Sequence, residues 1–194
     1  MSAVMPDFPA NDPLQSADRE VAKLRIPPHS VEAESSVLGG LLLDNMAWDR
    51  VGDLLKEADF YRHEHQLIFT AISVLINNSK PADVITVHEQ LQTVGKSDLV
   101  GGLIYLNTLA QYVPSASNIR RYAEIVRERS ILRKLVTASD EIATNAFNQQ
   151  GKTVERILDE AEAKIFNIGE EGSRNKQGFQ SLDTLVIDLL DQVQ

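Results

Sequence analysis

Apolar side chains recur at the spacing of an amphipathic helix along most of this chain. The clearest stripe lies at positions i, i+3, i+4, i+7 and i+8, which share one face of a helix. No segment alternates convincingly with the period of two that is typical of a half-buried strand. The stripe predicts a core helix and consists of Ile68, Ala71, Ile72, Leu75 and Ile76.

Capping signals place further helices on either side of this stripe. Ser30 is a favourable N-cap, and the pair Asp44-Asn45 marks a second helix start. The string TVHEQL has the capping-box form, which predicts Thr86 as the cap and Glu89 as its partner. Another short helix fits residues 102–112. The apolar positions of the first two helices are Val31, Leu38, Leu41, Leu42, Ala47, Trp48, Val51, Leu54 and Leu55.

A long helical hairpin is predicted after Pro114. Caps at residues 115–117 begin a helix that extends to about Asn148, and a turn at residues 149–151 leads to Thr153 as the next cap. The return helix must run antiparallel to the first because the connection is short. The expected inner stripe of the first helix is Tyr122, Val126, Leu132, Leu135, Val136, Ile142 and Phe147, and that of the second is Val154, Ile157, Leu158, Ala161, Ile165 and Ile168.

The last part of the chain has a different composition. The string GEEGSRNKQG is polar and rich in glycine, which is typical of a linker. Ser181 then caps a final amphipathic helix that has no core of its own to enter, so its apolar stripe needs a partner surface. That stripe includes Leu182, Leu185, Val186, Leu189 and Val193.

These patterns predict an all-α fold: a compact multi-helix globule, a long antiparallel helical hairpin and a detached C-terminal helix. The expected divisions are a mobile arm at 1–26, the globule at 27–114, the hairpin at 115–168, a flexible linker at 169–180 and a linker helix at 181–194.

Charge is distributed unevenly along the chain. The formal net charge of −9 opposes the binding of a phosphate backbone. Residues 28–115 carry 5 basic and 11 acidic side chains, whereas residues 118–148 carry 6 basic and 4 acidic ones. The basic side chains could remain solvated, support a protein interface or contact nucleic acid, but the stretch lacks exposed aromatic residues for stacking bases. They are Arg120, Arg121, Arg127, Arg129, Arg133 and Lys134.

Composition excludes several classes of chemistry. The chain contains no cysteine, which removes thiol nucleophiles, disulfides and cysteine-type zinc sites and is compatible with the cytosol. The first residues lack the basic and apolar blocks of a signal peptide, and polar residues interrupt the uncharged run at 99–119. We therefore expect neither secretion nor a membrane span.

Two tripeptides look like the end of a phosphate-binding loop. They are Gly95-Lys96-Ser97 and Gly151-Lys152-Thr153, but the upstream glycine that such a loop needs is replaced by Gln90 and Ala146. Both tripeptides follow helical patterns, so their glycines are predicted to close helices in a left-handed conformation. We expect no ATPase site and no cofactor in this chain.

His63-Glu64-His65 is the densest cluster of possible metal ligands. Residues two apart on a helix lie about 200° around its axis, so the two imidazoles cannot share one ion. The cluster is therefore predicted to lie on a surface helix without a metal, and no catalytic set is identified elsewhere in the sequence.

Four long strings follow one another along the chain: IPPHSVEAESSVLGGLLLDNMAWDRV, DFYRHEHQLIFTAI, GGLIYLNTLAQYVPSASNIRRYAEIVRERSILRKL and LDEAEAKIFNI. Together they cover roughly residues 26–168 and resemble the N-terminal domain of bacterial replicative DNA helicases of the DnaB type. The resemblance implies an all-α collar in a hexameric, ATP-dependent 5′–3′ DNA helicase of the bacterial cytoplasm. ATP and Mg²⁺ would belong to a RecA-like motor domain that has no counterpart in this chain, and the motor would make most of the DNA contacts.

The resemblance also implies partners. The hairpin would make contacts between subunits and help to present a surface to primase or to the helicase loader. The expected subunit interface is Ile119, Tyr122, Ile125 and Val126, although the pattern equally allows internal packing at these positions. The expected docking stripe of the linker helix on a neighbouring motor domain is Leu182, Leu185, Leu189 and Val193.

Two other classes of protein compete with this interpretation. A free-standing helical regulatory or DNA-binding protein would carry a short, exposed basic recognition helix, whereas the basic helix here is long and belongs to a hairpin. A small metal- or carboxylate-dependent enzyme would need a ligand or acid/base set, and the sequence shows none.

Overall fold

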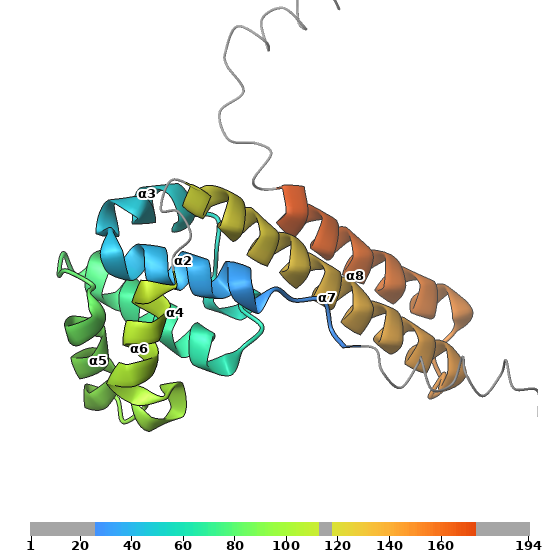
Figure 1. Cartoon of the computed structure of the whole chain (residues 1–194). Coiled ribbons are helices and arrows are strands. Elements are labelled where there is room, and N and C mark those ends of the chain that lie inside the picture. Colours follow the sequence, from blue (N-terminus) through green and yellow to red (C-terminus); the bar gives the residue numbers. More distant parts are fainter. Residues whose placement is uncertain (1–25, 113–117, 174–194) are drawn as a thin grey trace, which may run out of the picture.

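A computed structural model describes residues 26–112 and 118–173 of the chain (Figure 1). Within these ranges all regular structure is helical, which confirms the predicted all-α fold. The α-helices are α2 (Val31–Leu43), α3 (Trp48–Val51), α4 (His63–Asn77), α5 (Val84–Thr93), α6 (Gly102–Gln111), α7 (Ile119–Phe147) and α8 (Val154–Ser173). Three short 3₁₀ turns join them: η1 (Asn45–Ala47), η2 (Glu57–Asp59) and η3 (Asp98–Val100).

Helix α2 forms the centre of the globule. Ser30 caps it as predicted, because its hydroxyl accepts the N–H of Ala33 at 3.2 Å. The sequence predicts one apolar face, but all ten residues from Ala33 to Leu42 are buried, since α4, α6 and α7 pack around the helix. Gly40 allows the closest approach, because a Cβ atom there would lie 2.9 Å from Cδ1 of Ile119 in α7.

The core helix predicted from the apolar stripe is confirmed as α4. Its residues Ile68, Ala71, Ile72 and Leu75 are buried in the main hydrophobic cluster, and Ile76 packs against that cluster. Phe69 extends the core on a neighbouring face, because its ring lies 4.9 Å from Phe60 and 5.5 Å from Trp48 between centroids.

The predicted start of α5 is wrong by three residues. Asp83, not Thr86, is the N-cap, and its carboxylate accepts the N–H groups of Ile85 and Thr86. The Thr86 hydroxyl accepts the N–H of Asp83 in return. Asn45 fixes the preceding residue through two hydrogen bonds with the backbone of Ala82, so a contact 37 residues away sets this helix start.

The left-handed conformation predicted for Gly95 and Gly151 is confirmed, but only Gly95 closes a helix, because α7 ends at Phe147 and Gly151 lies in the turn before α8. Their φ angles are +69° and +78°, which is the left-handed region that glycine adopts without strain. The helix predicted at residues 102–112 is α6, and Tyr112 is its C-cap. The caps predicted at residues 115–117 lie outside the described residues, and Asn118 stands at the N-cap position of α7.

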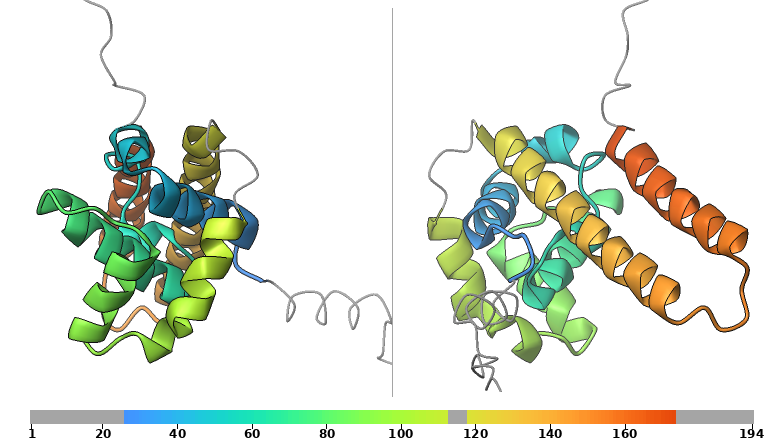
Figure 2. Two further views of the ribbon diagram at one scale, coloured as in Figure 1. Left: turned by 60° about the vertical axis from the view of Figure 1, so that its left-hand side comes forward. Right: turned by 90° about the vertical axis from the view of Figure 1, so that its right-hand side faces the viewer.

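Helices α7 and α8 form the predicted antiparallel hairpin, which projects from the globule (Figure 2). The first half of α7 nevertheless belongs to the globule, where Ile119, Ala123 and Val126 join the main core. The predicted inner stripe of α7 is therefore wrong in part: Val126 is buried, but the side chains beyond it are largely exposed. The exposed members are Leu132, Leu135, Val136 and Phe147.

Thr153 caps α8 as predicted and accepts the N–H of Arg156. The helix continues five residues beyond Ile168, where the hairpin is predicted to end, because Glu171 and Gly172 contact α7. None of the helices in the described part of the chain is long and apolar enough to cross a membrane.

Candidate protein-interaction surface

Helix α8 carries an exposed apolar stripe beside the side that faces α7. Ile157, Ala161 and Ile168 are partly buried on the side that faces α7. One residue along a helix turns the side chain by about 100°. Leu158 and Ile165 follow residues of the inner side and are therefore exposed, Leu158 to 60%.

Helix α7 presents a matching stripe. Its α8 side carries Ile131 and Lys134, and the residues that follow each of them, Leu132 and Leu135, are exposed. Each stripe lies one residue, or about 100°, beyond the side of its helix that faces the other helix. Because the two helices are antiparallel, this rotation places both stripes on the same side of the hairpin, away from the globule. We call this set the hairpin face: Leu132, Leu135 and Val136 of α7 with Val154, Leu158 and Ile165 of α8.

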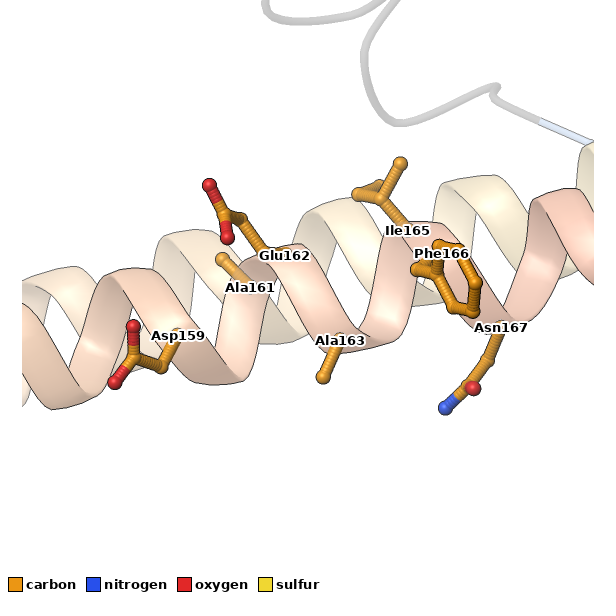
Figure 3. Close-up of a pocket in the computed structure, with 7 residues that line it drawn as sticks. All are labelled: Asp159, Ala161, Glu162, Ala163, Ile165, Phe166 and Asn167. Carbon is orange, nitrogen blue, oxygen red and sulfur yellow. The ribbon is translucent and has the colours of Figure 1, made fainter.

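Beside the hairpin face, a neighbouring part of the α8 surface lies open to solvent and consists of Asp159, Ala161, Glu162, Ala163, Ile165, Phe166 and Asn167. Figure 3 shows Ile165 and Glu162 on one flank of the helix, Ala163 and Asn167 on the other, and Phe166 between them. Phe166 is exposed despite its size. Exposed aromatic and aliphatic side chains rimmed by carboxylates are typical of protein–protein contact surfaces.

A buried carboxylate fixes the hairpin to the globule. Asp59, at the end of η2, is 1% exposed and accepts from Arg127 at 2.8 Å and from the Ser130 hydroxyl at 2.7 Å, both in α7. It also accepts the backbone N–H of Lys56 at 2.8 Å. Arg127 is almost buried and donates its other Nη to the backbone carbonyl of Glu171 at 2.7 Å. One guanidinium thus joins the globule, α7 and the end of α8.

Arg133 makes a second connection, about one helical turn beyond Ser130. Its guanidinium donates to the carbonyl oxygens of Pro28 at 2.8 Å and Asp59 at 2.6 Å. It also lies over the ring of Tyr61, which stacks on His29. Burial lowers the pKa of the Arg133 guanidinium from its ordinary value, while Glu34 and Asp59 act in the opposite direction.

Within the globule, His65 lies at the centre of a buried polar network. The sequence predicts a surface position for His65, but its side chain is 0% exposed. The local pattern could not reveal this burial, because the polar partners of the imidazole lie on other helices. Its Nδ1 lies 2.7 Å from the Glu34 carboxylate and its Nε2 lies 2.7 Å from the Tyr105 hydroxyl. The neutral tautomer that fits both contacts donates from Nδ1 and accepts at Nε2. Glu34 also accepts the N–H of Tyr61 at 2.7 Å.

Burial raises the pKa of the Tyr105 phenol, which keeps the hydroxyl protonated and able to donate to His65.

Replacing Tyr105 by phenylalanine should lower the free energy of unfolding by about 1–3 kcal/mol, because it leaves Nε2 of His65 buried without a donor. Urea unfolding measures this loss. Tyr112→Phe is the control, since its ring is exposed at the end of the same helix, and an equal loss in both variants would contradict the role of the hydrogen bond.

Two of the four predicted interface residues lie inside the chain's own fold. Ile119 is 1% exposed and Val126 is 2% exposed, so neither can meet a partner while the globule is folded. Tyr122 and Ile125 are partly buried against the same core. The predicted docking stripe of the linker helix, Leu182, Leu185, Leu189 and Val193, lies outside the described residues.

Half of the basic side chains on α7 have partners within the chain that hold the hairpin in place. Arg127 and Arg133 bind the η2 region, and Lys134 pairs with the Glu171 carboxylate of α8. Arg120 and Arg121 form exposed ion pairs with Glu124 of the same helix. The structure therefore gives Arg127, Arg133 and Lys134 a supporting role within the chain's own fold, while Arg120, Arg121 and Arg129 stay exposed.

The described residues offer no group of three or more histidine, cysteine or carboxylate side chains that could hold a metal ion. Sequence reasoning did not single out Asp59, although this residue begins the string DFYRHEHQLIFTAI, and it placed Arg127 only among the basic side chains.

The comparisons with known proteins agree on one family. Residues 26–128 match the family described as "DnaB-like helicase N terminal domain". The "Replicative DNA helicase DnaB" of Haemophilus influenzae is 40% identical over 180 residues, which cover 93% of this chain and 38% of that protein. The "Replicative DNA helicase DnaC" of Bacillus subtilis is 36% identical over 170 residues, which cover 88% of this chain and 37% of that protein. This chain thus spans less than two fifths of these relatives.

Solved structures share the fold. The crystal structure of the N-terminal domain of DnaB helicase from Mycobacterium tuberculosis matches with a TM-score of 0.70 at 38% identity, over 73% of this chain and 99% of that chain. A structure of a DnaB-like replicative helicase, described with its interactions with primase, matches with a TM-score of 0.61 at 20% identity. The match covers 82% of this chain and 34% of that chain, and it concerns the fold alone.

Proposed function

Because this chain belongs to the DnaB-like helicase family and matches its N-terminal domain, we propose that it is the non-catalytic collar of a hexameric replicative DNA helicase. The observation that carries the proposal is the hairpin face. It places six exposed apolar side chains on one side of a rigid hairpin, where a copy of the same chain can cover them. The collar would assemble through this face rather than through Ile119 and Val126.

The ATP-dependent helicase activity of such a protein would reside in a region that corresponds to the part of the relatives that this chain does not match. There a motor domain would bind ATP and Mg²⁺, drive 5′–3′ translocation and contact DNA in the cytoplasm. The segments before both Gly-Lys-Ser/Thr tripeptides support this assignment, since α5 and α7 precede them where a phosphate-binding loop would follow a strand, and Gln90 and Ala146 stand where its upstream glycine would be.

The collar would also present a surface to primase and to the helicase loader. The relative whose structure is described with primase supports the first of these partners. Exposed Phe166, beside the hairpin face and rimmed by Glu162 and Asp159, gives a partner both an apolar anchor and an acidic rim. Light scattering after size exclusion, with and without primase, tests this docking.

Self-association through the hairpin face is tested by the double variant Leu158→Asp with Ile165→Asp. We expect the wild-type chain to associate in a concentration-dependent way and the double variant to weaken association by about 100-fold or more, because two apolar side chains lose their burial. Sedimentation equilibrium over a range of concentrations measures the change.

The matched control for this experiment is Ile104→Asp. Ile104 is 82% exposed on α6, on the globule and away from the hairpin face, so its variant should associate like the wild type. The proposed assembly would be refuted by a wild-type chain that stays monomeric throughout, or by equal losses in both variants. Circular dichroism and a cooperative melt show that each variant is folded.

A further inference from the structure

A cleft of about 460 Å³ lies on the globule between α4, the C-terminal end of α5 and the turn η2. Its floor is apolar, because Leu67, Ala71 and Leu91 are buried beneath it. Val74 and Val94 also line the cleft, and they are 39% and 51% exposed. A ligand in this cleft would therefore cover apolar surface that the fold leaves open to water.

Two sequence motifs that the proposed function does not use meet at this cleft. Lys96 comes from the tripeptide Gly95-Lys96-Ser97, and His63 comes from the cluster His63-Glu64-His65. Gln90 is a third polar side chain in the lining. Within the described part of the chain, these three side chains have no hydrogen-bond or ion-pair partner. The cleft thus offers an ammonium group, an imidazole and an amide for binding a ligand.

Other polar side chains of the cleft already have partners. Thr70 donates to the Glu57 carboxylate at 2.9 Å, and Gln66 donates to the carbonyl oxygen of Phe60 at 2.8 Å. Lys96 is the one lysine or arginine in the lining, and Glu57 is the one carboxylate. A single unpaired cation favours a ligand with one negative charge, and Glu57 would repel a second charge. A carboxylate therefore fits better than a phosphate dianion.

A second depression adjoins the cleft, and four lining residues are common to both. They are Glu57, Ala58, Thr70 and Val74. An extended chain whose apolar side chain enters the cleft can continue across these residues, which favours a peptide over a compact free acid. The rest of the globule is acidic, since residues 28–115 carry 5 basic and 11 acidic side chains. An acidic peptide is therefore repelled by most of this surface and attracted at Lys96.

We propose that this cleft binds a peptide segment of a partner protein in which a large apolar side chain lies next to a carboxylate. The apolar side chain covers Leu67, Leu91 and Val94, and the carboxylate accepts from Lys96 and Gln90. This site goes beyond the proposed collar function. It lies on the globule, and it does not depend on self-association through the hairpin face.

Fluorescence anisotropy with a labelled peptide tests the site on the whole chain. The probe carries phenylalanine next to glutamate, flanked by glycine and serine. We expect saturable binding, and we expect it to weaken about fivefold or more when glutamine replaces the glutamate or alanine replaces the phenylalanine.

Lys96→Met tests the charged end of the cleft. It should weaken binding of the probe about three- to tenfold, because the carboxylate loses a charge-assisted hydrogen bond at a partly open site. Lys80→Met is the matched control, since Lys80 is an exposed lysine in the connection between α4 and α5 and does not line the cleft. Its affinity for the probe should equal that of the wild type.

Val74→Asp tests the apolar wall. It should weaken binding about tenfold or more, because it removes apolar surface and places a negative charge near the bound carboxylate. Ile85→Asp makes the same change of charge at an exposed position of α5 outside the cleft. Its affinity should stay within about twofold of the wild type, since distant exposed charges are screened. Circular dichroism shows that each variant is folded.

The proposal is overturned if the probe does not bind saturably, or if the glutamine and alanine peptides bind as tightly as the probe. It is also overturned by equal losses in Lys96→Met and Lys80→Met, or in Val74→Asp and Ile85→Asp. A peptide that bound in this way would be attracted by the acidic chain at some other place.

Discussion

Replacing Asp59 by alanine is expected to lower the free energy of unfolding by about 3–5 kcal/mol. The variant leaves the almost buried guanidinium of Arg127 without its carboxylate, and it removes the acceptor for the Ser130 hydroxyl and the Lys56 N–H. An unpaired buried charge is destabilising because the protein interior solvates it poorly. Urea unfolding followed by circular dichroism measures the loss.

The matched control is Asp53→Ala, since Asp53 is an exposed aspartate in the same connection between α3 and η2. It should change the free energy of unfolding by less than about 0.5 kcal/mol, as surface substitutions usually do. A loss below about 1 kcal/mol in the Asp59 variant would show that the buried pair contributes no more than a surface ion pair.

Glu34→Ala is expected to have an effect of similar size, about 3–5 kcal/mol, because it leaves two donors unpaired and opens a cavity. Its carboxylate is 1% exposed and accepts from His65 at 2.7 Å and from the Tyr61 N–H at 2.7 Å. Without it, the buried His65 and the partly buried N–H of Tyr61 lose their acceptor, and a cavity replaces the side chain. Thermal unfolding in a calorimeter detects the loss as a lower Tm.

Glu32→Ala serves as the comparison, because Glu32 is exposed in the same first turn of α2 and interacts with the helix dipole and with the Ser30 hydroxyl. Its loss should stay below about 1 kcal/mol. If the two glutamate variants melt at the same temperature, the network around His65 does not stabilise the globule.

The helices themselves were largely predictable from the sequence. Periodicity and caps located α2, α4, α6, α7 and α8, because these signals are local. The start of α5 was not predictable, since Asn45 positions it from 37 residues away. The buried side of α7 was also mispredicted. This helix packs against the globule on one side and against α8 on another, so its buried residues do not form the single apolar stripe that the prediction assumed.

The interaction surface was predictable only in part. Leu132, Leu135, Val136 and Leu158 all appear in the predicted stripes, but the stripes were assigned to internal packing. Which side of each helix remains free depends on the crossing of α7 with α2, and no local pattern encodes that crossing. Asp59 and Arg127 lie 68 residues apart in sequence, so their pairing required the fold.

The continuity of α7 makes the hairpin a lever. Its 29 residues form one rod about 43 Å long, whose first turns are seated in the globule core and whose far end carries the hairpin tip. A rotation of about 10° in that seat would displace the tip by several ångströms. The globule holds this rod as far as Arg127 and Ser130, which both donate to Asp59, so the free arm of the lever begins beyond them. A change at this one buried carboxylate would therefore alter the direction of the hairpin as well as the stability of the globule.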